Sequence, residues 1–332
     1  MKALLSKVVG GPETLVLEDV PSPTAGPGQV VLTVKACGVN FPDSLMIEDR
    51  YQFKPERPFA PGGEVAGIIK EVGAGVTGVK SGDRVLANAG SGGMVEEMAL
   101  DEKRIIPIPD EMPFDEASAF ILTYGTSYYG LKDRGFLKPG QTLLVLGAAG
   151  GVGISAVQLG KAMGARVIAA ASSQEKVDFC MSHGADAGVV YPAGPFDKDG
   201  KKELAAIFKE AVGPNGADVI YDGVGGDYAE ASFRSIGWDG RFLVIGFPAG
   251  IPAIPLNLAL LKSGDIVGVF WGAAVARNQA QHLQNVKELF ELYKAGKIKP
   301  FVSERFPLAQ GADAIRHLTS RKALGKVVVT MD

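Results

Sequence analysis

The residues with the clearest chemical meaning are glycines in the stretch TLLVLGAAGGVG, at positions 142–153. A short apolar run ends in Gly147, Gly150, Gly151 and Gly153, and a helical pattern, ISAVQLGKAMGA, follows at once. Glycine lets a backbone approach a phosphate closely, and the first turn of a helix offers free N–H donors and the positive end of its dipole. A strand, a glycine turn and a helix start in this order predict a site for the pyrophosphate of a dinucleotide.

The end of the next strand indicates which dinucleotide fits. In a nucleotide-binding unit of this kind, an acidic residue there binds the ribose 2′-hydroxyl, whereas a nearby cation in its absence accommodates a 2′-phosphate. Here RVIAAA ends at Ala171, Ser172 and Ser173 follow, and Lys176 lies in the next predicted helix. We therefore expect NADPH rather than NAD. The alternative is that the serines only cap the helix while Lys176 lies in solvent, and the two roles are compatible.

Two patterns of secondary structure surround these motifs. Residues 1–110 hold β-type runs separated by Gly-Pro, Pro-Gly and Gly-Asp pairs, which predicts a compact antiparallel or barrel-like β domain. From about residue 141, apolar runs alternate with helical segments, which predicts a parallel sheet with helices on both faces. A last helix is expected over 277–295, and GKVVVTMD is expected to be a strand that returns to the first domain.

The composition is that of an ordinary globular protein and disfavours several functions. The 332 residues are 46% hydrophobic and 21% charged, and the net charge of −3 offers no basic surface for nucleic acid. Two cysteines, Cys37 and Cys180, cannot build a disulfide framework or a Cys-rich zinc site. The N-terminus lacks the apolar core of a signal peptide, so a cytoplasmic location is expected. The uncharged stretches 139–160 and 242–261 are interpreted as buried strands and loops rather than membrane spans, because glycines or prolines interrupt them.

Several motifs along the whole chain resemble those of one family. They are GVNFPD at 38–43, PGGEVAGIIKEVG at 61–73, GDRV at 82–85, GTSYYGL at 125–131, PGQTLLVLGAAGGVG at 139–153 and GKVVV at 325–329. In this order they resemble the medium-chain dehydrogenase/reductase superfamily, and within it the zinc-free NADPH:quinone oxidoreductase, or zeta-crystallin-like, branch. The resemblance implies an α/β fold. A Rossmann domain with a doubly wound parallel sheet would cover 122–271, and a GroES-like β-barrel domain would combine 1–121 with 272–332.

The zinc ligands of the related alcohol dehydrogenases are missing from this chain. Those enzymes carry a Cys where this chain has Asn40 and a His where it has Gly63. Without that thiolate and imidazole, zinc loses its usual ligands. Cys37 lies three residues early and is interpreted as a core residue. The histidines fall in separate helical segments, at His183, His282 and His317. We therefore expect no metal.

Three residues of the first domain are expected to serve catalysis, because Asn40, Asp43 and Tyr51 match positions that line the active site in the quinone reductase branch. Without zinc, a conjugated acceptor is easier to reduce than an isolated ketone, since charge delocalises onto a distant oxygen. The expected substrate is a quinone or another α,β-unsaturated carbonyl. Asn40 would donate its amide to an oxyanion, and Tyr51 its hydroxyl or a proton. The alternatives are that Asp43 only fixes its loop and that Tyr51 packs against Phe53.

Further positions match the cofactor site of the family. The residues expected to contact NADPH are Thr126, Gly150, Gly151, Val152, Gly153, Ser172, Ser173, Lys176, Tyr191, Gly246, Phe247, Phe270 and Trp271. Thr126 would lie beside the nicotinamide amide. The pair 246–247 follows the run FLVI and the pair 270–271 ends the last Rossmann strand, so both are expected to border the cleft near the nicotinamide. Trp271 has a second interpretation, as a residue buried at a subunit contact.

Other features keep alternatives open. Lys54, Glu56 and Arg57 put charge near the substrate loop, which favours an enoyl-CoA or acrylyl-CoA type reductase as the alternative. The insert GPFDKDGKK at 194–202 is interpreted as a solvated loop. A non-catalytic, crystallin-like or RNA-binding protein is a third possibility, which the net charge and the intact glycine turn disfavour. The family pairs as homodimers, and VGVFW at 267–271 is apolar enough to extend a sheet across a two-fold axis.

Overall fold

The computed structural model describes residues 1–331 and divides into two units. Unit 1 contains Met1–Leu122 and Pro300–Asp332, and unit 2 contains Thr123–Lys299. The first division lies one residue from the sequence-based boundary. The second lies at 299/300 rather than 271/272, so residues 272–299 belong to unit 2 by their contacts.

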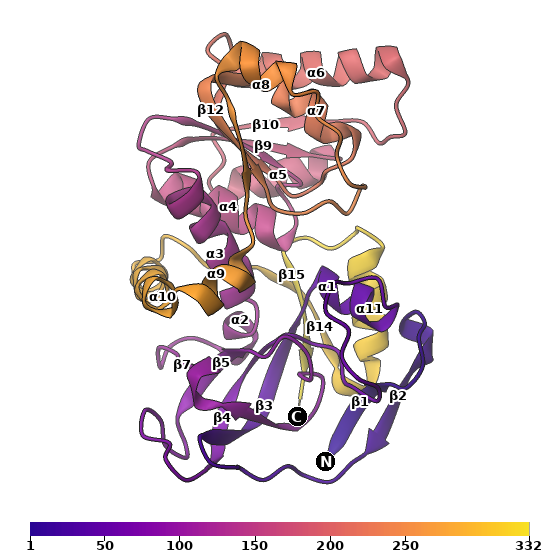
Figure 1. Cartoon of the computed structure of the whole chain (residues 1–332), viewed down its shortest axis with the longest axis vertical. Coiled ribbons are helices and arrows are strands. Elements are labelled where there is room, and N and C mark those ends of the chain that lie inside the picture. The colour runs from indigo at the N-terminus through magenta and orange to yellow at the C-terminus, as the bar shows by residue number, and fades with distance from the viewer. Residues whose placement is uncertain (332) are drawn as a thin grey trace. The chain divides into compact units, whose positions relative to one another are not determined.

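Unit 1 is built mainly from antiparallel strands, which confirms the β domain predicted from its runs and turns (Figure 1). The main sheet has the order β14-β15-β3-β4-β5-β7, β6 also pairs with β3, and β1 pairs with β2. The strands are β1 (Lys2–Ser6), β2 (Leu15–Asp19), β3 (Gln29–Val39), β4 (Glu64–Val72), β5 (Arg84–Asn88), β6 (Glu97–Asp101), β7 (Ile105–Pro107), β14 (Val302–Pro307) and β15 (Lys326–Thr330). Short helices accompany them: α1 (Phe41–Ile47), α2 (Phe114–Ala117) and α11 (Gly311–Thr319).

The C-terminal strand returns to the N-terminal part of the chain, as predicted. β15 lies antiparallel to β3, with Val327 opposite Val39 and Val329 opposite Cys37. These side chains are buried in the core of unit 1, which confirms the interpretation of Cys37 as a core residue. The pairing brings the first residue of β15, Lys326, next to the end of β3, where the candidate catalytic residues begin.

Unit 2 contains the parallel sheet that the alternating pattern predicts. Its order is β10-β9-β8-β11-β12-β13, the doubly wound order in which β9 and β10 are added on one side of β8 and β11 to β13 on the other. The strands are β8 (Thr142–Leu146), β9 (Arg166–Ala171), β10 (Ala187–Val190), β11 (Ala217–Asp222), β12 (Ile236–Val244) and β13 (Asp265–Gly268). In such a sheet, ligands bind outside the carboxyl ends of the strands.

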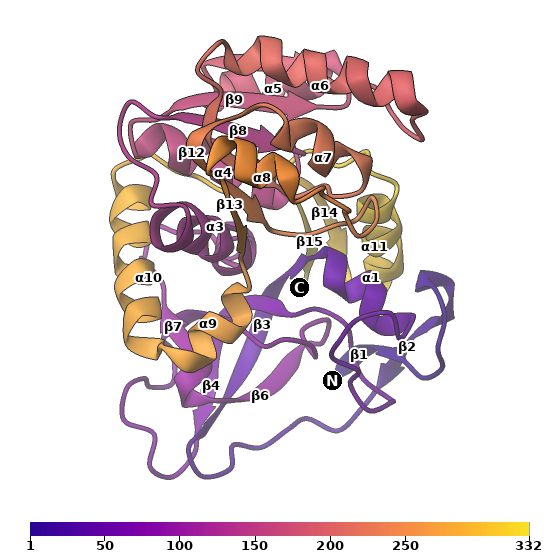
Figure 2. The same ribbon diagram turned by 45° about the horizontal axis from the view of Figure 1, so that its top comes forward.

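Helices pack on both faces of this sheet (Figure 2). Those that contact its strands are α4 (Gly151–Ala162), α5 (Gln174–Ser182), α6 (Lys198–Val212), α7 (Asp227–Phe233) and α8 (Asn257–Lys262). The chain adds α3 (Ile121–Tyr128), which begins at the end of unit 1, and α9 (Trp271–Arg277) and α10 (Gln279–Lys294). Gly160 of α4 approaches β8 so closely that a Cβ would lie 2.5 Å from Leu143 Cδ2. Leu144, the residue of β8 after Leu143, points to the opposite face of the sheet and packs in a cluster with Phe208 of α6.

Two local expectations are wrong. The insert 194–202 is not a loop throughout, because α6 begins at Lys198 and the Asp197 side chain caps it by accepting from the Gly200 N–H at 2.8 Å. A capping Asp starts the helix earlier than its apolar pattern indicates. The last strand, β13, ends at Gly268, so Phe270 and Trp271 do not end it. Phe270 precedes α9, and Trp271 is its first residue.

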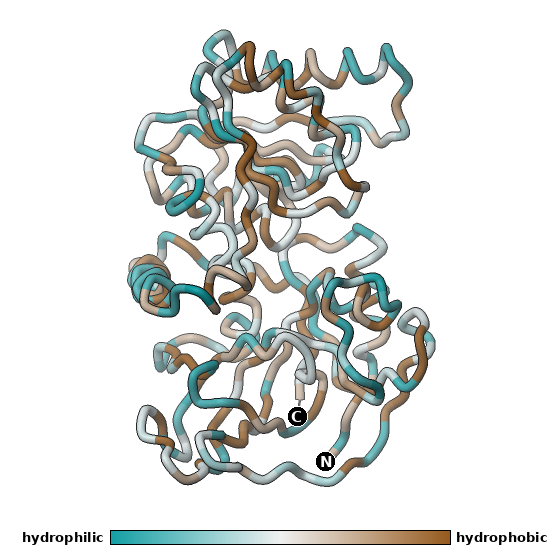
Figure 3. The backbone as a smooth tube through the Cα atoms, in the orientation of Figure 1, coloured by the Kyte–Doolittle hydropathy of each residue, from teal (hydrophilic) through white to brown (hydrophobic). Residues whose placement is uncertain are grey.

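The packing of Trp271 explains why residues 272–299 belong to unit 2. Its ring lies against Gly125 of α3, where a Cβ would lie 2.8 Å away, and edge-on to His282 of α10 at 5.7 Å. The Tyr128 hydroxyl also donates to Glu288 of α10 at 2.7 Å. In Figure 3 the strands of unit 2 are largely brown, whereas much of α10 is teal. Within residues 1–331, no helix combines the length and apolar character needed to cross a membrane.

Candidate active site and nucleotide site

The glycine turn of unit 2 has the geometry expected of a phosphate site. Gly147 directly follows β8 and has φ +66°, a conformation that favours glycine. A Cβ at Gly153 would lie 2.2 Å from the carbonyl oxygen of Gly147, so this position excludes any side chain. Gly150 precedes α4, whose first turn has N–H groups without helical acceptors. The turn therefore presents donors and a dipole end to an anion.

A cluster of buried hydroxyls holds the first turn of α4 in place, and the sequence did not reveal it. Ser127 Oγ of α3 lies 2.7 Å from the Tyr221 hydroxyl of β11 and 2.8 Å from Ser155 Oγ of α4. Both serine hydroxyls lie 3.0 Å from the carbonyl oxygen of Val152. Because these side chains are fully buried, their bonds have no competition from solvent. The first turn of α4 is thus tied to α3 and β11.

The residues predicted to hold a 2′-phosphate lie together at the end of β9. Ser173 Oγ accepts from the Lys176 N–H at 3.4 Å and so caps α5. Lys176 Nζ lies 3.3 Å from Ser172 Oγ. The capping alternative is therefore observed, and the ammonium lies beside a hydroxyl at a helix start, where an anion is favoured. Tyr191, predicted to contact NADPH, is buried against Phe208 and Tyr228, with ring centroids 6.1 and 5.0 Å away.

A buried aspartate organises the turns that follow β11 and β12. Asp222 Oδ1 accepts from the N–H groups of Val224 and Gly225 at 2.8 and 2.9 Å, and its carbonyl oxygen accepts from those of Ile245 and Gly246. Burial raises the pKa of Asp222 to about 6. Its Oδ2 finds no hydrogen-bond partner among residues 1–331. The only sequence signal was a carboxylate at the end of a buried strand, in YDGVGG.

The remaining predicted cofactor residues differ in exposure. Phe247, after β12, and Phe270, before α9, are both about half exposed, whereas Trp271 is buried. Thr126 lies in α3, one residue before Ser127 of the hydroxyl cluster. Gly246 has open space around it, since a Cβ there would meet nothing within 4 Å. Trp271 packs against Gly125 of α3, and both of its interpretations stay predictions.

The candidate catalytic residues of unit 1 lie where β3 passes into α1. Asp43 is fully buried, and its two carboxylate oxygens accept from the N–H groups of Asn40 at 2.7 Å and Gly62 at 3.1 Å. Desolvation raises its pKa to about 6, although these hydrogen bonds oppose the shift. The contacts correspond to the loop-fixing alternative for Asp43.

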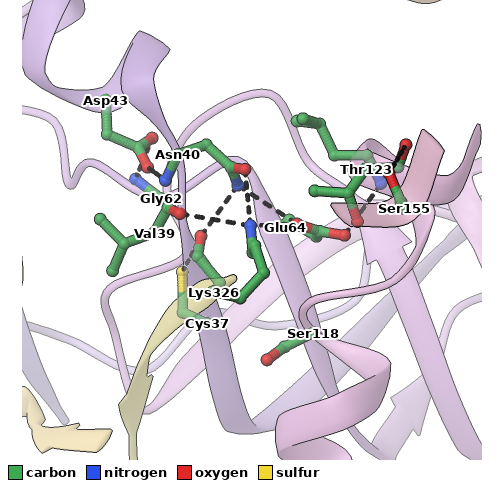
Figure 4. Close-up of polar contacts among 12 residues, drawn as sticks. Cys37, Val39, Asn40, Asp43, Gly62, Glu64, Ser118, Thr123, Ser155 and Lys326 are labelled. Carbon is green, nitrogen blue, oxygen red and sulfur yellow. Dashed lines mark hydrogen bonds and ion pairs between the residues drawn. The ribbon is translucent and has the colours of Figure 1, made fainter. Parts of the chain in front are cut away.

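The carboxamide of Asn40 is engaged within a buried polar cluster (Figure 4). Its Nδ2 donates to the Gly38 carbonyl oxygen at 3.1 Å and to Glu64 Oε2 at 3.2 Å. Its Oδ1 accepts from Lys326 Nζ at 2.6 Å. Since both amide hydrogens have acceptors, this arrangement does not fit the predicted role of Asn40 as an oxyanion donor.

Sequence reasoning missed Lys326 and gave no role to Glu64. Lys326 is only 4% exposed, and its ammonium donates to the carbonyl oxygen of Val39, to Asn40 and to Glu64 Oε2 at 3.1 Å. The other carboxylate oxygen of Glu64 accepts from the Leu122 N–H at 2.9 Å. The available signal was weak: a lysine at the start of the buried strand GKVVV, and a glutamate directly after the glycine that replaces a zinc ligand.

Tyr51 is partly buried, and its surroundings are compatible with both of its interpretations, hydroxyl donation and packing against Phe53. Its ring lies 6.1 Å from that of Phe53, which fits the packing alternative. Burial and the negative charge of Asp43 raise the pKa of Tyr51, so its hydroxyl keeps its proton at neutral pH and can donate.

The charged loop after Tyr51 is partly committed to the fold. Arg57 pairs with Asp49 at 2.8 Å, donates to the Ile47 carbonyl oxygen at 2.9 Å and lies 5.5 Å from the Phe59 ring centroid. Of the three charged residues that favoured a CoA thioester substrate, Lys54, Glu56 and Arg57, the last is therefore already paired within the fold.

The position of Gly63 explains how the fold differs from a zinc site. A Cβ at Gly63 would lie 2.8 Å from the carbonyl oxygen of Gly90, so a histidine there requires a backbone shift. Within residues 1–331, no group of three or more His, Cys, Asp or Glu side chains is placed to hold a metal ion. The absence of a catalytic metal stays a prediction.

Two family models match separate parts of the chain. The model described as "Zinc-binding dehydrogenase" matches residues 151–289, within unit 2. The model described as "Alcohol dehydrogenase GroES-like domain" matches residues 26–110, within unit 1.

Similar proteins match along nearly the whole chain. The "Quinone oxidoreductase-like protein 2 homolog" of Nematostella vectensis is 38% identical over 333 residues, which cover 99% of this chain and 88% of that protein. The structure of a probable oxidoreductase from Mycobacterium abscessus superposes with a TM-score of 0.89 at 36% identity, covering 99% of this chain and 98% of that one. The quinone oxidoreductase of Escherichia coli, solved in complex with NADPH, gives a TM-score of 0.90 at 27% identity, covering 99% and 100%. The chain is therefore an oxidoreductase that joins a GroES-like domain to a Rossmann domain, and it belongs to the quinone oxidoreductase branch of the medium-chain dehydrogenase/reductase superfamily.

Proposed function

We propose that this protein is an NADPH-dependent, zinc-independent reductase that transfers hydride to a quinone or another conjugated carbonyl compound. The observation that carries the proposal is the end of β9, where Lys176 and Ser172 lie together in the place of the acidic residue that NAD-binding units carry. The Escherichia coli relative was solved with NADPH, which supports the same cofactor.

The proposed cofactor contacts follow from the carboxyl ends of the strands. The glycine turn at 147–153 would bind the pyrophosphate through backbone N–H groups, and Ser172, Ser173 and Lys176 would bind the 2′-phosphate. NADPH supplies the hydride when bound. Thr126 and the turns that Asp222 organises would orient the nicotinamide. The remaining proposed contacts are Tyr191, Gly246, Phe247, Phe270 and Trp271.

Tyr51 is the proposed donor to the substrate oxygen. Its raised pKa keeps the hydroxyl protonated, so it can stabilise the negative charge that develops on a conjugated oxygen and then deliver a proton. Asn40 and Asp43 are proposed to hold the loop that carries this hydroxyl, since their polar atoms are engaged with backbone and buried side chains.

A substrate panel tests the proposal. The purified protein is mixed with NADPH and, in parallel, with 1,4-naphthoquinone, 2-cyclohexenone or crotonyl-CoA, and NADPH oxidation is followed at 340 nm. We expect the quinone or the enone to be reduced faster than the thioester, because Arg57 is committed to Asp49. Faster reduction of crotonyl-CoA would favour the thioester alternative. Absence of NADPH binding and of turnover with every acceptor would refute the proposal.

We also propose that the protein forms a homodimer through β13. This strand pairs with β12, its other side is a sheet edge within the described structure, and apolar side chains are exposed on nearby α8. Leu260 is 81% exposed and Leu261 is 65% exposed. Unpaired edges and exposed apolar residues favour association. Light scattering should give twice the chain mass at micromolar concentration and the monomer mass for Leu260→Glu, whereas a monomeric parent would contradict the proposal.

A further inference from the structure

We propose that Lys326 is a positioning residue of the candidate active site: from the C-terminal strand it fixes the Asn40 carboxamide and the path of the chain into α1. The idea rests on the proposed function for its kinetic readout only. Its structural readout is independent of any substrate.

The geometry of the ammonium group carries the inference. Lys326 Nζ lies 2.6 Å from Asn40 Oδ1, 3.1 Å from Glu64 Oε2 and 3.2 Å from the carbonyl oxygen of Val39. An ammonium has three N–H donors, and these contacts use all of them. With 4% of its surface exposed, the group has little access to water. A buried cation is costly unless it is paired, so this satisfied arrangement is specific for an ammonium.

The contacts show what Lys326 positions. The bond to Val39 fixes the last peptide of β3, directly before Asn40, and the bond to Asn40 Oδ1 determines which way the carboxamide faces. The Nδ2 group already has acceptors in the Gly38 carbonyl oxygen and Glu64 Oε2, and the ammonium supplies the donor that Oδ1 requires in the same orientation. Asn40 in turn donates its backbone N–H to Asp43, at the start of α1. Lys326 of β15 therefore fixes the Val39 carbonyl group and the Asn40 carboxamide directly, and through Asn40 it supports the contact with Asp43.

The charges around Asp43 separate this role from simple packing. Four titratable groups interact electrostatically with Asp43: Lys326, Glu64, Cys37 and Tyr51. The cation of Lys326 lowers the pKa of Asp43, and the anion of Glu64 raises it. Removing the charge of Lys326 should therefore raise the pKa of Asp43, and removing the charge of Glu64 should lower it. Loss of packing alone has no reason to produce opposite shifts.

The experiment uses the full chain in four variants: Lys326→Met, Lys326→Arg, Glu64→Gln and the double variant Lys326→Met/Glu64→Gln. Lys322→Met, at an exposed lysine that precedes the same strand, is the matched control. The Asp43 carboxyl carbon is observed by NMR in protein labelled with ¹³C at aspartate, and Asp43→Asn identifies its signal. NADPH affinity and the turnover of naphthoquinone are measured in parallel.

The expected pattern has three parts. Relative to the parent, the Asp43 titration moves to higher pH in Lys326→Met, moves to lower pH in Glu64→Gln and stays unchanged in Lys322→Met. Turnover falls at least about tenfold in Lys326→Met, while the dissociation constant of NADPH changes less than about twofold, because the nucleotide turn is part of unit 2. Lys326→Arg keeps the charge and recovers the titration at least in part, but its planar fork restores turnover incompletely.

Some results would overturn the proposal. Titration shifts of the same sign in the two single variants, or no shift, would show that Lys326 only fills space. Full turnover in Lys326→Met/Glu64→Gln would show that the pair is needed for folding alone. If Lys326→Met does not fold, the comparison of Glu64→Gln with the double variant isolates the charge of Lys326, and the Asp43 titration is expected at higher pH in the double variant. If the parent lacks reductase activity, the proposed function fails, but the NMR titration still decides whether Lys326 positions this cluster.

Discussion

The nucleotide turn of unit 2 and the polar cluster of unit 1 are built by opposite means. The turn uses backbone atoms from one short stretch, and Gly147 and Gly153 are there because a side chain would collide with the main chain or with a neighbour. The cluster uses side chains from distant parts of the sequence, with Lys326 and Asn40 separated by 286 positions. A local backbone site is visible in a sequence motif, whereas a long-range side-chain site depends on how strands pair.

The largest loss of NADPH affinity is expected at Gly153, where the turn has no space for a side chain. Gly153→Ala places a Cβ about 2.2 Å from the carbonyl oxygen of Gly147, so the turn must open. We expect NADPH affinity to fall at least about a hundredfold in fluorescence titrations, equivalent to about 2.7 kcal/mol. Gly272→Ala is the control, since a Cβ there meets its nearest atom at 3.9 Å. Equal affinities of parent and Gly153→Ala would refute the backbone account of this site.

A second prediction uses one buried carboxyl from each region. The pKa values of Asp43 and Asp222 are raised from 3.8 to about 6, so the folded protein binds their protons more tightly than the unfolded chain does. Each group therefore contributes stability that is fully present below pH 3.8 and is lost as the pH rises through about 6. The shift corresponds to at most about 3 kcal/mol per group.

Substitution by asparagine tests the sign of this effect. In Asp43→Asn and in Asp222→Asn, the part of the pH dependence of unfolding free energy that lies between about pH 4 and 6 should shrink, as measured by urea unfolding across that range. Asp19→Asn, at an exposed carboxyl, is the control. A steeper dependence in either buried variant would contradict the raised pKa of that group.

A third prediction concerns the phosphate specificity of unit 2. Lys176→Ala removes the cation beside Ser172, so NADPH should bind about tenfold to thirtyfold more weakly, while NADH binding stays the same. Isothermal titration with the two dinucleotides provides the comparison within one variant. Parallel losses for both would mean that Lys176 supports the fold of α5 rather than the 2′-phosphate.

The smallest expected effect separates donation from packing in unit 1. Tyr51→Phe keeps the ring beside Phe53 and removes the hydroxyl. If Tyr51 donates to the substrate oxygen, the turnover number falls about tenfold or more with NADPH affinity unchanged. Phe53→Leu is the matched packing control, at a side chain that is 60% exposed. An unchanged turnover number in Tyr51→Phe would leave only the packing role.

The same contrast explains how far the sequence predicts this protein. The strands of unit 2, the glycine turn and the return of β15 follow from periodicity and local motifs, and the structure confirms them. The roles of Lys326 and Glu64 could not be predicted, because their partners are set by the pairing of β3 with β15 and β4. The cluster of Ser127, Ser155 and Tyr221 could not be predicted either, because its hydroxyls come from α3, α4 and β11, which meet only in the folded chain. The early start of α6 depends on one capping Asp, and β13 ends at Gly268 within a continuous apolar run, so neither is visible in the apolar pattern.

The central claim is that hydride from NADPH reaches a conjugated acceptor without help from zinc. Its most direct test is the initial rate of 1,4-naphthoquinone reduction by the parent protein with NADPH or NADH, before and after dialysis against a strong chelator, with residual zinc measured by mass spectrometry. We predict reduction with NADPH at a rate that the chelator does not change, and a rate at least about tenfold lower with NADH at equal subsaturating concentration. Activity that disappears with the chelator and returns with added zinc, or the absence of NADPH oxidation, would contradict the account.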